Sequence, residues 1–181
     1  MRRIIALAGY ATAGKSTIAA LFQSRNPGFR RHSFAKPLKE MADPVLDDMG
    51  LPLVSDGSHA KEQRRPFYVF LGRVMRNAQP NYWVRKLANA LPSAYDILID
   101  DLRYANEAEW VVQNRGLVVY VSRPGVKAAN AEEWTSIGRM CDIFHPQELL
   151  NDDTPESAAG RLEMLAELHF RDRAALDDAV I

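Results

Sequence analysis

A glycine-rich segment near the N-terminus carries the clearest chemistry in the chain. Residues 9–16 read GYATAGKS and fit G-x-x-x-x-G-K-[ST], the pattern of a phosphate-binding loop, or P-loop. In such a loop, successive backbone N–H groups converge on one anion, and the following helix adds the positive end of its dipole. Gly9 and Gly14 permit backbone angles and close approach that a side chain would prevent. The pattern therefore predicts binding of nucleotide phosphates.

The residues of this loop have distinct expected roles. Lys15 is expected to reach the β- and γ-phosphates of ATP and to act in catalysis, and the hydroxyl of Ser16 is expected to bind Mg²⁺. The whole ATP-binding set comprises Gly9, Ala11, Thr12, Ala13, Gly14, Lys15, Ser16 and Thr17. ATP and Mg²⁺ are thus the expected cofactors. The alternative is a glycine-rich turn with a coincidental Lys-Ser pair, which the apolar run before it and the amphipathic pattern after it disfavour.

An acidic pair follows the next strongly apolar segment. Asp100 and Asp101 come directly after the apolar residues 97–99. P-loop enzymes usually hold Mg²⁺ or its waters with an acid at the end of a neighbouring strand. Because side chains alternate along a strand, only one of the two is expected to face the phosphates. The sequence leaves open which one serves the metal, and the alternative is that both only cap a loop.

Arginines outside the loop suit a second phosphate-bearing substrate. The guanidinium group stays charged and binds phosphate through two parallel hydrogen bonds. The candidates are Arg64, Arg65, Arg73, Arg76, Arg103, Arg123 and Arg139. Each alone can be an ordinary surface residue, but as a set they favour a kinase over a simple ATP hydrolase. The chain also lacks the N-K-x-D motif of guanine-specific switches and the L-S-G-G-Q motif of transporter ATPases.

Alternating apolar strands and amphipathic helices are expected to position these residues. Strands are predicted over 4–8, 29–34, 96–100 and 117–121, and helices over 15–25, 36–48, 61–77, 81–91, 105–114 and 155–169. Loops are predicted over 50–59 and 124–138, and a frayed tail after 169. This order predicts an α/β protein with a P-loop NTPase-type three-layer fold and a mostly parallel central sheet.

Composition fits a globular domain. The chain has 181 residues, 47% of them hydrophobic, and 23 basic residues balance 23 acidic ones. We therefore expect no stable nucleic acid partner and no membrane association. The single cysteine, Cys141, cannot form an internal disulfide and fits a reducing compartment. Residues 2–13 loosely imitate a secretory signal, but the apolar run over 4–8 is shorter than the roughly 7–15 residues of a signal core. A cytoplasmic location is expected.

Four sequence blocks resemble the deoxynucleoside monophosphate kinases of bacteriophages, within the P-loop nucleotide kinases. The first block is the P-loop. The second, SFAKPLKE over 33–40, is similar to the family's F-A-x-P-L-K-E segment, and the fourth, DLRYANEA over 101–108, is similar to D-x-R-F-x-N-E-A. The third is looser: Leu71-Gly72-Arg73, then Arg76, then Pro80-Asn81-Tyr82-Trp83 resembles G-T-x-x-x-R…P-D-x-W. Together the blocks span about residues 4 to 125, in the family's order.

The resemblance implies an ATP-dependent (deoxy)nucleoside monophosphate kinase that serves dNTP synthesis, in the host cytoplasm if the protein is phage-encoded. Small nucleotides would be its partners. The expected acceptor-binding residues are Phe34, Lys36, Arg65, Arg76, Trp83, Arg103, Asn106 and Glu107, and the expected catalytic residues are Lys15, Arg103 and Arg123. We expect a single domain over 1–181, with a helical acceptor-binding insertion over 36–92 and a lid over 123–139. Phe34 and Trp83 could equally be core residues, and Glu107 could serve only the start of its helix.

The chain also departs from the family's pattern. Arg73 stands where the family usually has threonine, the usual glutamine is not evident in 68–70, and the segment NAEEW over 130–134 lacks the histidine of the family's His-and-Glu segment. One alternative is another small-molecule P-loop kinase, similar to dephospho-coenzyme A kinase. Another is a nucleotide-binding module without transferase activity. The sequence leaves base specificity, sugar specificity and oligomeric state open, with a homodimer as one option.

Overall fold

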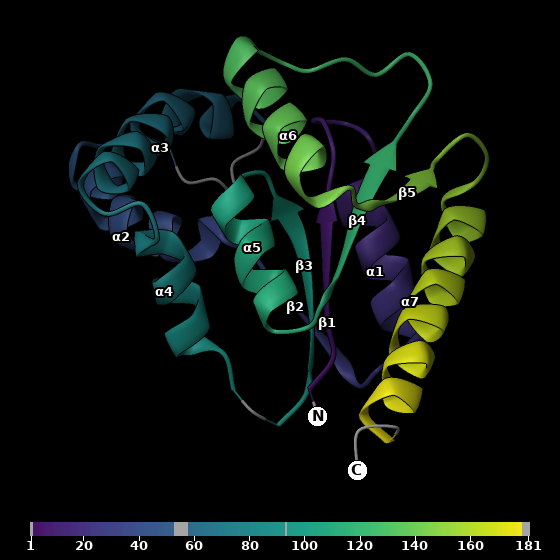
Figure 1. Ribbon diagram of the computed structural model, residues 1–181. Coiled ribbons are helices and arrows are strands. Elements are labelled where there is room, and N and C mark those ends of the chain that lie inside the picture. The colour runs from purple at the N-terminus through teal and green to yellow at the C-terminus, as the bar shows by residue number, and fades with distance from the viewer. Residues whose placement is uncertain (1, 53–57, 93, 179–181) are drawn as a thin grey trace. The chain divides into compact units, whose positions relative to one another are not determined.

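Figure 1 shows the computed structural model, which describes residues 2–52, 58–92 and 94–178. The chain divides into two compact units. The first combines Met1–Ser33 with Pro92–Ile181, and the second is Phe34–Leu91. The second unit nearly coincides with the segment that the sequence analysis expects to bind the acceptor, and that role stays a prediction. We describe each unit by itself.

The first unit is built on a parallel sheet. Within the described residues its strands are β1 (Ile4–Ala8), β2 (Phe29–His32), β3 (Asp96–Leu102), β4 (Leu117–Ser122) and β5 (Gln147–Leu150). They lie in the order β2-β3-β1-β4-β5, and every neighbouring pair is parallel. All residues of the central strand β1 are buried, as expected of a strand that is covered on both faces. The predicted α/β class with a parallel sheet is confirmed.

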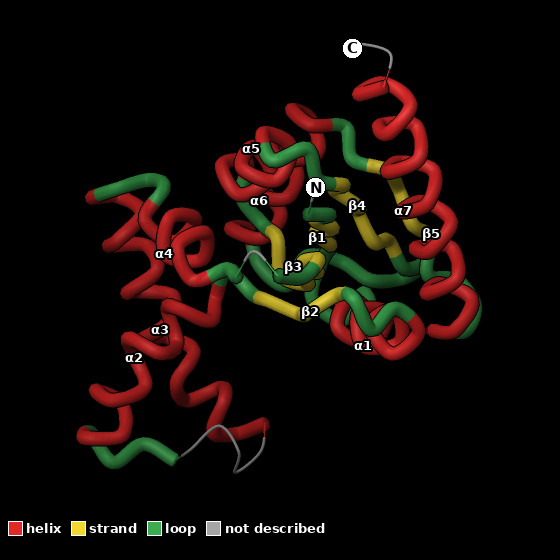
Figure 2. The backbone as a smooth tube through the Cα atoms, turned by 90° about the horizontal axis from the view of Figure 1, so that it is seen from below, coloured by secondary structure: helices red, strands yellow, loops and turns green. Residues whose placement is uncertain are grey.

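Helices cover both faces of this sheet, as Figure 2 shows. On one face α1 (Lys15–Arg25) packs against α7 (Pro155–Asp178), and on the other α5 (Ala105–Gln113) packs against α6 (Ala131–Phe144). The core beneath α1 and α7 includes the buried residues Leu7, Phe22, Val119 and Leu162. The result is the three-layer arrangement that the sequence predicts, with the loop after β1 at the carboxyl edge of the sheet.

The second unit is helical. It contains α2 (Ala35–Asp48), α3 (Ser58–Ala78) and α4 (Tyr82–Ala90). Arg64 of α3 is 1% exposed, and its guanidinium donates to the carboxylates of Asp43 and Asp47 on α2. It also donates to the carbonyl oxygens of Leu51 and Pro52. This arginine therefore joins α3 to α2 and is not positioned as a phosphate ligand.

Three segments differ from the sequence prediction. The stretch 124–138, predicted as irregular, becomes helical from Ala131 onward, because the Asn130 side chain accepts from the Glu133 N–H at 2.9 Å and so caps α6. Strand β5 was not predicted, and α7 extends to Asp178, well past residue 169. Part of the predicted loop over 50–59 lies outside the described residues. None of the helices in the described ranges has the length and apolar character that a membrane span requires.

Candidate functional site

The segment between β1 and α1 forms a tight turn that only glycine permits at two positions. Gly9, Thr12 and Gly14 have φ angles of +140°, +65° and +97°. A Cβ atom on Gly9 would lie 2.4 Å from the carbonyl oxygen of Val121, and one on Gly14 would lie 2.4 Å from Nδ2 of Asn151. Among the described residues, no side chain caps the start of α1. The N–H groups of its first turn therefore point toward a place where an anion can bind.

Asn151 supports this turn from the end of β5. It is 7% exposed, and its side-chain Nδ2 donates to the carbonyl oxygen of Ala13 at 2.8 Å. Its backbone N–H donates to the carbonyl oxygen of Ser122 at 2.7 Å. These bonds tie the loop to the carboxyl ends of β4 and β5. Asn151 was not among the predicted site residues. The available signal was its place directly after β5, but this strand was not predicted.

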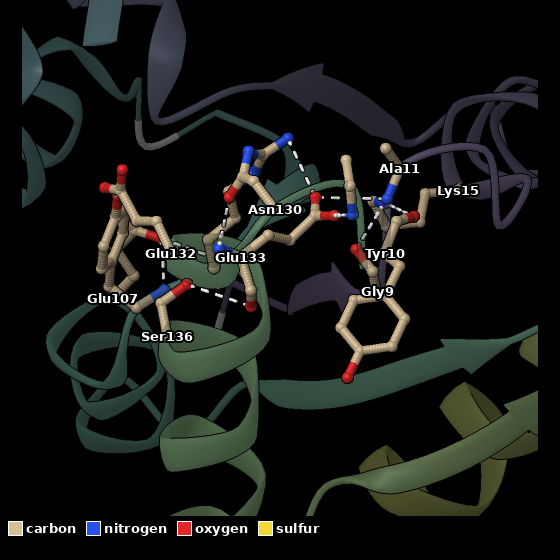
Figure 3. Close-up of polar contacts among 12 residues, drawn as sticks. Gly9, Tyr10, Ala11, Lys15, Glu107, Asn130, Glu132, Glu133 and Ser136 are labelled. Carbon is tan, nitrogen blue, oxygen red and sulfur yellow. Dashed lines mark hydrogen bonds and ion pairs between the residues drawn. The ribbon is translucent and has the colours of Figure 1, made fainter. Parts of the chain in front are cut away.

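Lys15 is folded over the loop, as Figure 3 shows. Its Nζ donates to the carbonyl oxygens of Gly9 and Tyr10, at 2.7 Å each. Burial lowers the pKa of Lys15 and the nearby charge of Arg103 lowers it further, while Glu133, Asp100 and Asp101 act in the opposite direction. Both predicted metal-binding acids and Arg103, a second predicted catalytic residue, are thus near enough for their charges to act on Lys15.

The acids Asp100 and Asp101 lie where the pairing of β1 with β3 becomes irregular. Ala6 pairs with Ile99 but Ala8 pairs with Leu102, so β3 contains one extra residue at this point. Asp100 forms an ion pair with Arg31 at 2.5 Å, and Asp101 accepts a hydrogen bond from Ser33 Oγ at 2.6 Å. Regular alternation does not hold across a bulge. Strand alternation therefore does not decide which acid faces the phosphates, and the role of either acid in binding the metal stays a prediction.

Glu107 holds the segment that carries Arg103. It is 3% exposed, and its Oε2 accepts from the N–H groups of Arg103 and Tyr104, at 2.9 and 3.1 Å. These bonds correspond to the alternative role at the start of a helix. Asn106 beside it is half-buried. The predicted contact of both side chains with the acceptor nucleotide stays a prediction.

A carboxylate from α6 reaches the apex of the loop. Glu133 is 2% exposed, its Oε1 accepts from the Ala11 N–H at 3.2 Å, and its Oε2 accepts from the Ala129 N–H at 2.8 Å (Figure 3). The same Oε1 lies 3.6 Å from Nη2 of Arg103. Beside it, the Trp134 ring stacks on Tyr10 with 6.2 Å between the ring centroids. Glu133 lies within the predicted lid over 123–139 but was not among the predicted site residues.

The other predicted residues lie as follows. Arg123 is exposed just after β4, in the first unit. In the second unit, Phe34 and Trp83 are 3% and 2% exposed, and the Trp83 Nε1 donates to the carbonyl oxygen of Gly72. The remaining acceptor candidates are Lys36 and Arg65, both exposed, and Arg76, which is half-buried. The burial of Phe34 and Trp83 is what core residues show, and an acceptor role for all these side chains stays a prediction.

Comparison with known proteins identifies the fold. No protein-family model and no curated protein sequence matches the chain. Among solved structures, a shikimate kinase from Aquifex aeolicus aligns with a TM-score of 0.52 and 13% identity, covering 94% of this chain and 98% of that one. A gluconokinase from Sinorhizobium meliloti aligns with a TM-score of 0.49 and 14% identity, covering 94% and 99%. The first alignment shows that the chain shares the overall fold of that shikimate kinase.

Proposed function

We propose that the protein transfers the γ-phosphate of ATP to the 5′-phosphate of a (deoxy)nucleoside monophosphate. The observation that carries this proposal is the loop over 9–16, with two sterically required glycines and an uncapped helix start. The charges of Arg103, Asp100 and Asp101 all act on Lys15, the residue expected to contact the phosphates. The fold shared with a shikimate kinase supports phosphotransfer in general, and the four sequence blocks support a nucleotide acceptor.

The residues around the loop fit a magnesium–nucleotide complex. Mg²⁺ prefers hard oxygen ligands and usually takes one or two carboxylates together with substrate phosphates. Ser16 and one of the two acids, Asp100 or Asp101, would hold it. Asp100 forms an ion pair with Arg31, and Asp101 accepts a hydrogen bond from Ser33 Oγ. When bound, the metal would neutralise part of the phosphate charge. Lys15 would exchange its two carbonyl partners for phosphate oxygens.

Charge stabilisation by cations is the main chemical contribution of the protein. Phosphoryl transfer depends on positioning and on stabilising the spreading negative charge, and an ionised acceptor phosphate needs no general base. The positive charge of Arg103 lowers the pKa of Lys15, which shows that the two cations repel each other. A phosphate placed between them relieves this repulsion. Arg123 and the segment 123–139 would add charge and exclude water, and the helical unit would supply the acceptor site.

Affinity for MgATP should fall as the pH rises through the pKa of Lys15. Burial lowers this pKa in the free protein, and bound polyphosphate raises it because an anion favours the ammonium form. Binding in the interval between the two values takes up a proton, so affinity is highest below the free-protein pKa and declines above it. Dissociation constants measured by calorimetry from about pH 7 to about pH 10 check this. Lys15→Arg should give a flatter profile because arginine stays charged, and identical profiles would contradict the assignment.

An acceptor panel tests the proposed reaction. ATP labelled in the γ-phosphate is incubated with Mg²⁺ and each ribo- and deoxyribonucleoside monophosphate, with dephospho-coenzyme A, shikimate and gluconate as further acceptors. The proposal expects label in the diphosphate of at least one nucleotide. Label only in a non-nucleotide product would favour a different small-molecule kinase. ATP binding without any transfer would favour a nucleotide-binding module.

A further inference from the structure

We infer that Glu133 is a positioning residue that fixes the Arg103 guanidinium beside the phosphate loop. The inference rests on the proposed phosphotransfer, in which Arg103 stabilises the transferred phosphate. Glu133 itself would touch no substrate. Its effect on the reaction would pass through Arg103.

Glu133 is a buried carboxylate with partners that compensate its burial. The side chain is 1% exposed, and a buried carboxylate is costly unless hydrogen bonds and opposite charge compensate it. Its partners come from three separate segments: Ala11 in the loop, Ala129 before α6 and Arg103 after β3. One carboxylate therefore joins the phosphate loop, the lid region and the segment that carries a predicted catalytic arginine.

The two oxygens of Glu133 have different partners. Oε2 accepts from Ala129 at 2.8 Å, within the segment that opens α6, and the Asn130 cap fixes the Glu133 backbone. Oε1 faces away from this segment, toward the Ala11 N–H at 3.2 Å and Arg103 Nη2 at 3.6 Å. At 3.6 Å the ion pair is longer than a hydrogen bond. Glu133 thus attracts the guanidinium without taking up its N–H donors, which suits an arginine that must bind phosphate.

A second buried glutamate holds the other end of Arg103. Glu107 accepts from the Arg103 backbone N–H at 2.9 Å, so the backbone is fixed by one carboxylate and the guanidinium is oriented by another. Lys15 repels the same guanidinium, as the lowering of its pKa by Arg103 indicates. Without the charge of Glu133, this repulsion is expected to turn the half-exposed Arg103 away from the loop.

A double-mutant cycle tests whether Glu133 acts through Arg103. Glu133→Gln is compared with Glu132→Gln, and both are made in the wild-type and Arg103→Ala backgrounds. Glu132 is an exposed carboxylate in the same helical turn that accepts from the Tyr104 hydroxyl at 2.8 Å, and the side-chain carbonyl of glutamine can keep this bond while the charge is lost. In the wild-type background, Glu133→Gln should lower kcat by about tenfold or more and leave KM for ATP within about threefold, while Glu132→Gln changes little. In the Arg103→Ala background, Glu133→Gln should cost less than about twofold further. An equal loss in both backgrounds, or no loss in the wild-type background, would overturn the inference.

A second variant and an NMR measurement complete the test. If Glu133→Gln does not fold, Glu133→Asp keeps the charge but retracts it, and a smaller kcat loss with the same dependence on Arg103 is expected. The NMR signal of the Arg103 side-chain Nε–H can be recorded without any phosphate-accepting substrate, so this measurement does not depend on the proposed reaction. It should report an ordered guanidinium in the wild type and in Glu132→Gln, and a mobile one in Glu133→Gln. A protein that phosphorylates no acceptor but shows this change would refute the proposed function alone, whereas unchanged Arg103 mobility would refute the positioning role.

Discussion

Replacing Lys15 with alanine should abolish phosphoryl transfer and leave the protein folded. The Nζ of Lys15 donates to two carbonyl oxygens of its own loop. Neither hydrogen bond joins two separate helices or strands, so their loss should not destabilise the fold. The lost charge, by contrast, lies where negative charge develops in the reaction. Loss of one such stabilising group lowers kcat by roughly 10²–10³-fold or more. Steady-state rates with the best nucleotide acceptor, together with thermal unfolding, measure both effects.

Arg171→Ala is a suitable control for the Lys15 variant. Arg171 is an exposed cation on α7 and belongs to no predicted site, so its loss should change neither rate nor melting temperature beyond small surface effects. Turnover by Lys15→Ala close to that of Arg171→Ala would mean that the loop does not act on the transferred phosphate.

Gly9→Ala should cause the largest loss of stability among single glycine substitutions in the loop. The new Cβ would lie 2.4 Å from the carbonyl oxygen of Val121, which belongs to the pairing of β4 and cannot move aside without disturbing the sheet. The φ angle of +140° adds backbone strain for any side chain. Strain of about 1–3 kcal/mol and overpacking of about 1–3 kcal/mol together predict a loss of about 2–6 kcal/mol. Denaturant unfolding of purified protein measures this free energy.

Gly138→Ala is the matched control for this substitution. Gly138 lies within α6, and a Cβ there would meet nothing within 4 Å. Alanine is favoured over glycine in a helix interior by about 0.5–1 kcal/mol, so this variant should be slightly more stable than the wild type. If Gly9→Ala unfolded at the same denaturant concentration as the wild type, the close approach of the loop to β4 would be wrong.

The fold was predictable where burial leaves a simple pattern. The apolar run of β1 and the helical pattern of α1 gave bounds that match the structure. Helix α6 was missed because one of its three buried residues is Glu133, and a charged residue at an inward position hides the apolar stripe formed with Ile137 and Met140. Strand β5 was missed because Leu149 is its only buried residue, as is common for a short edge strand.

The site was predictable only where its parts are contiguous in sequence. The loop and the acidic pair each carry a local signal, and in the structure the charges of both acids act on Lys15 of the loop. Asn151 and Glu133, however, contact loop residues that are 138 and 122 positions away in the sequence. No local sequence pattern could therefore predict these contacts. The number of arginines also did not show which of them could bind phosphate. Arg64 joined the phosphate-binding candidates by residue type, but it is buried against carboxylates within the helical unit.

The central claim is that the backbone N–H groups of the loop and of the start of α1 bind the phosphates of ATP. Titration of ¹⁵N-labelled protein with MgATP, followed by NMR, tests this most directly. We expect the amide signals of residues 13–17 to shift in a saturable manner, and unlabelled adenosine without phosphates to leave them in place. Amide signals of 13–17 that stay unchanged at saturating MgATP would contradict the account, whatever else in the protein responded.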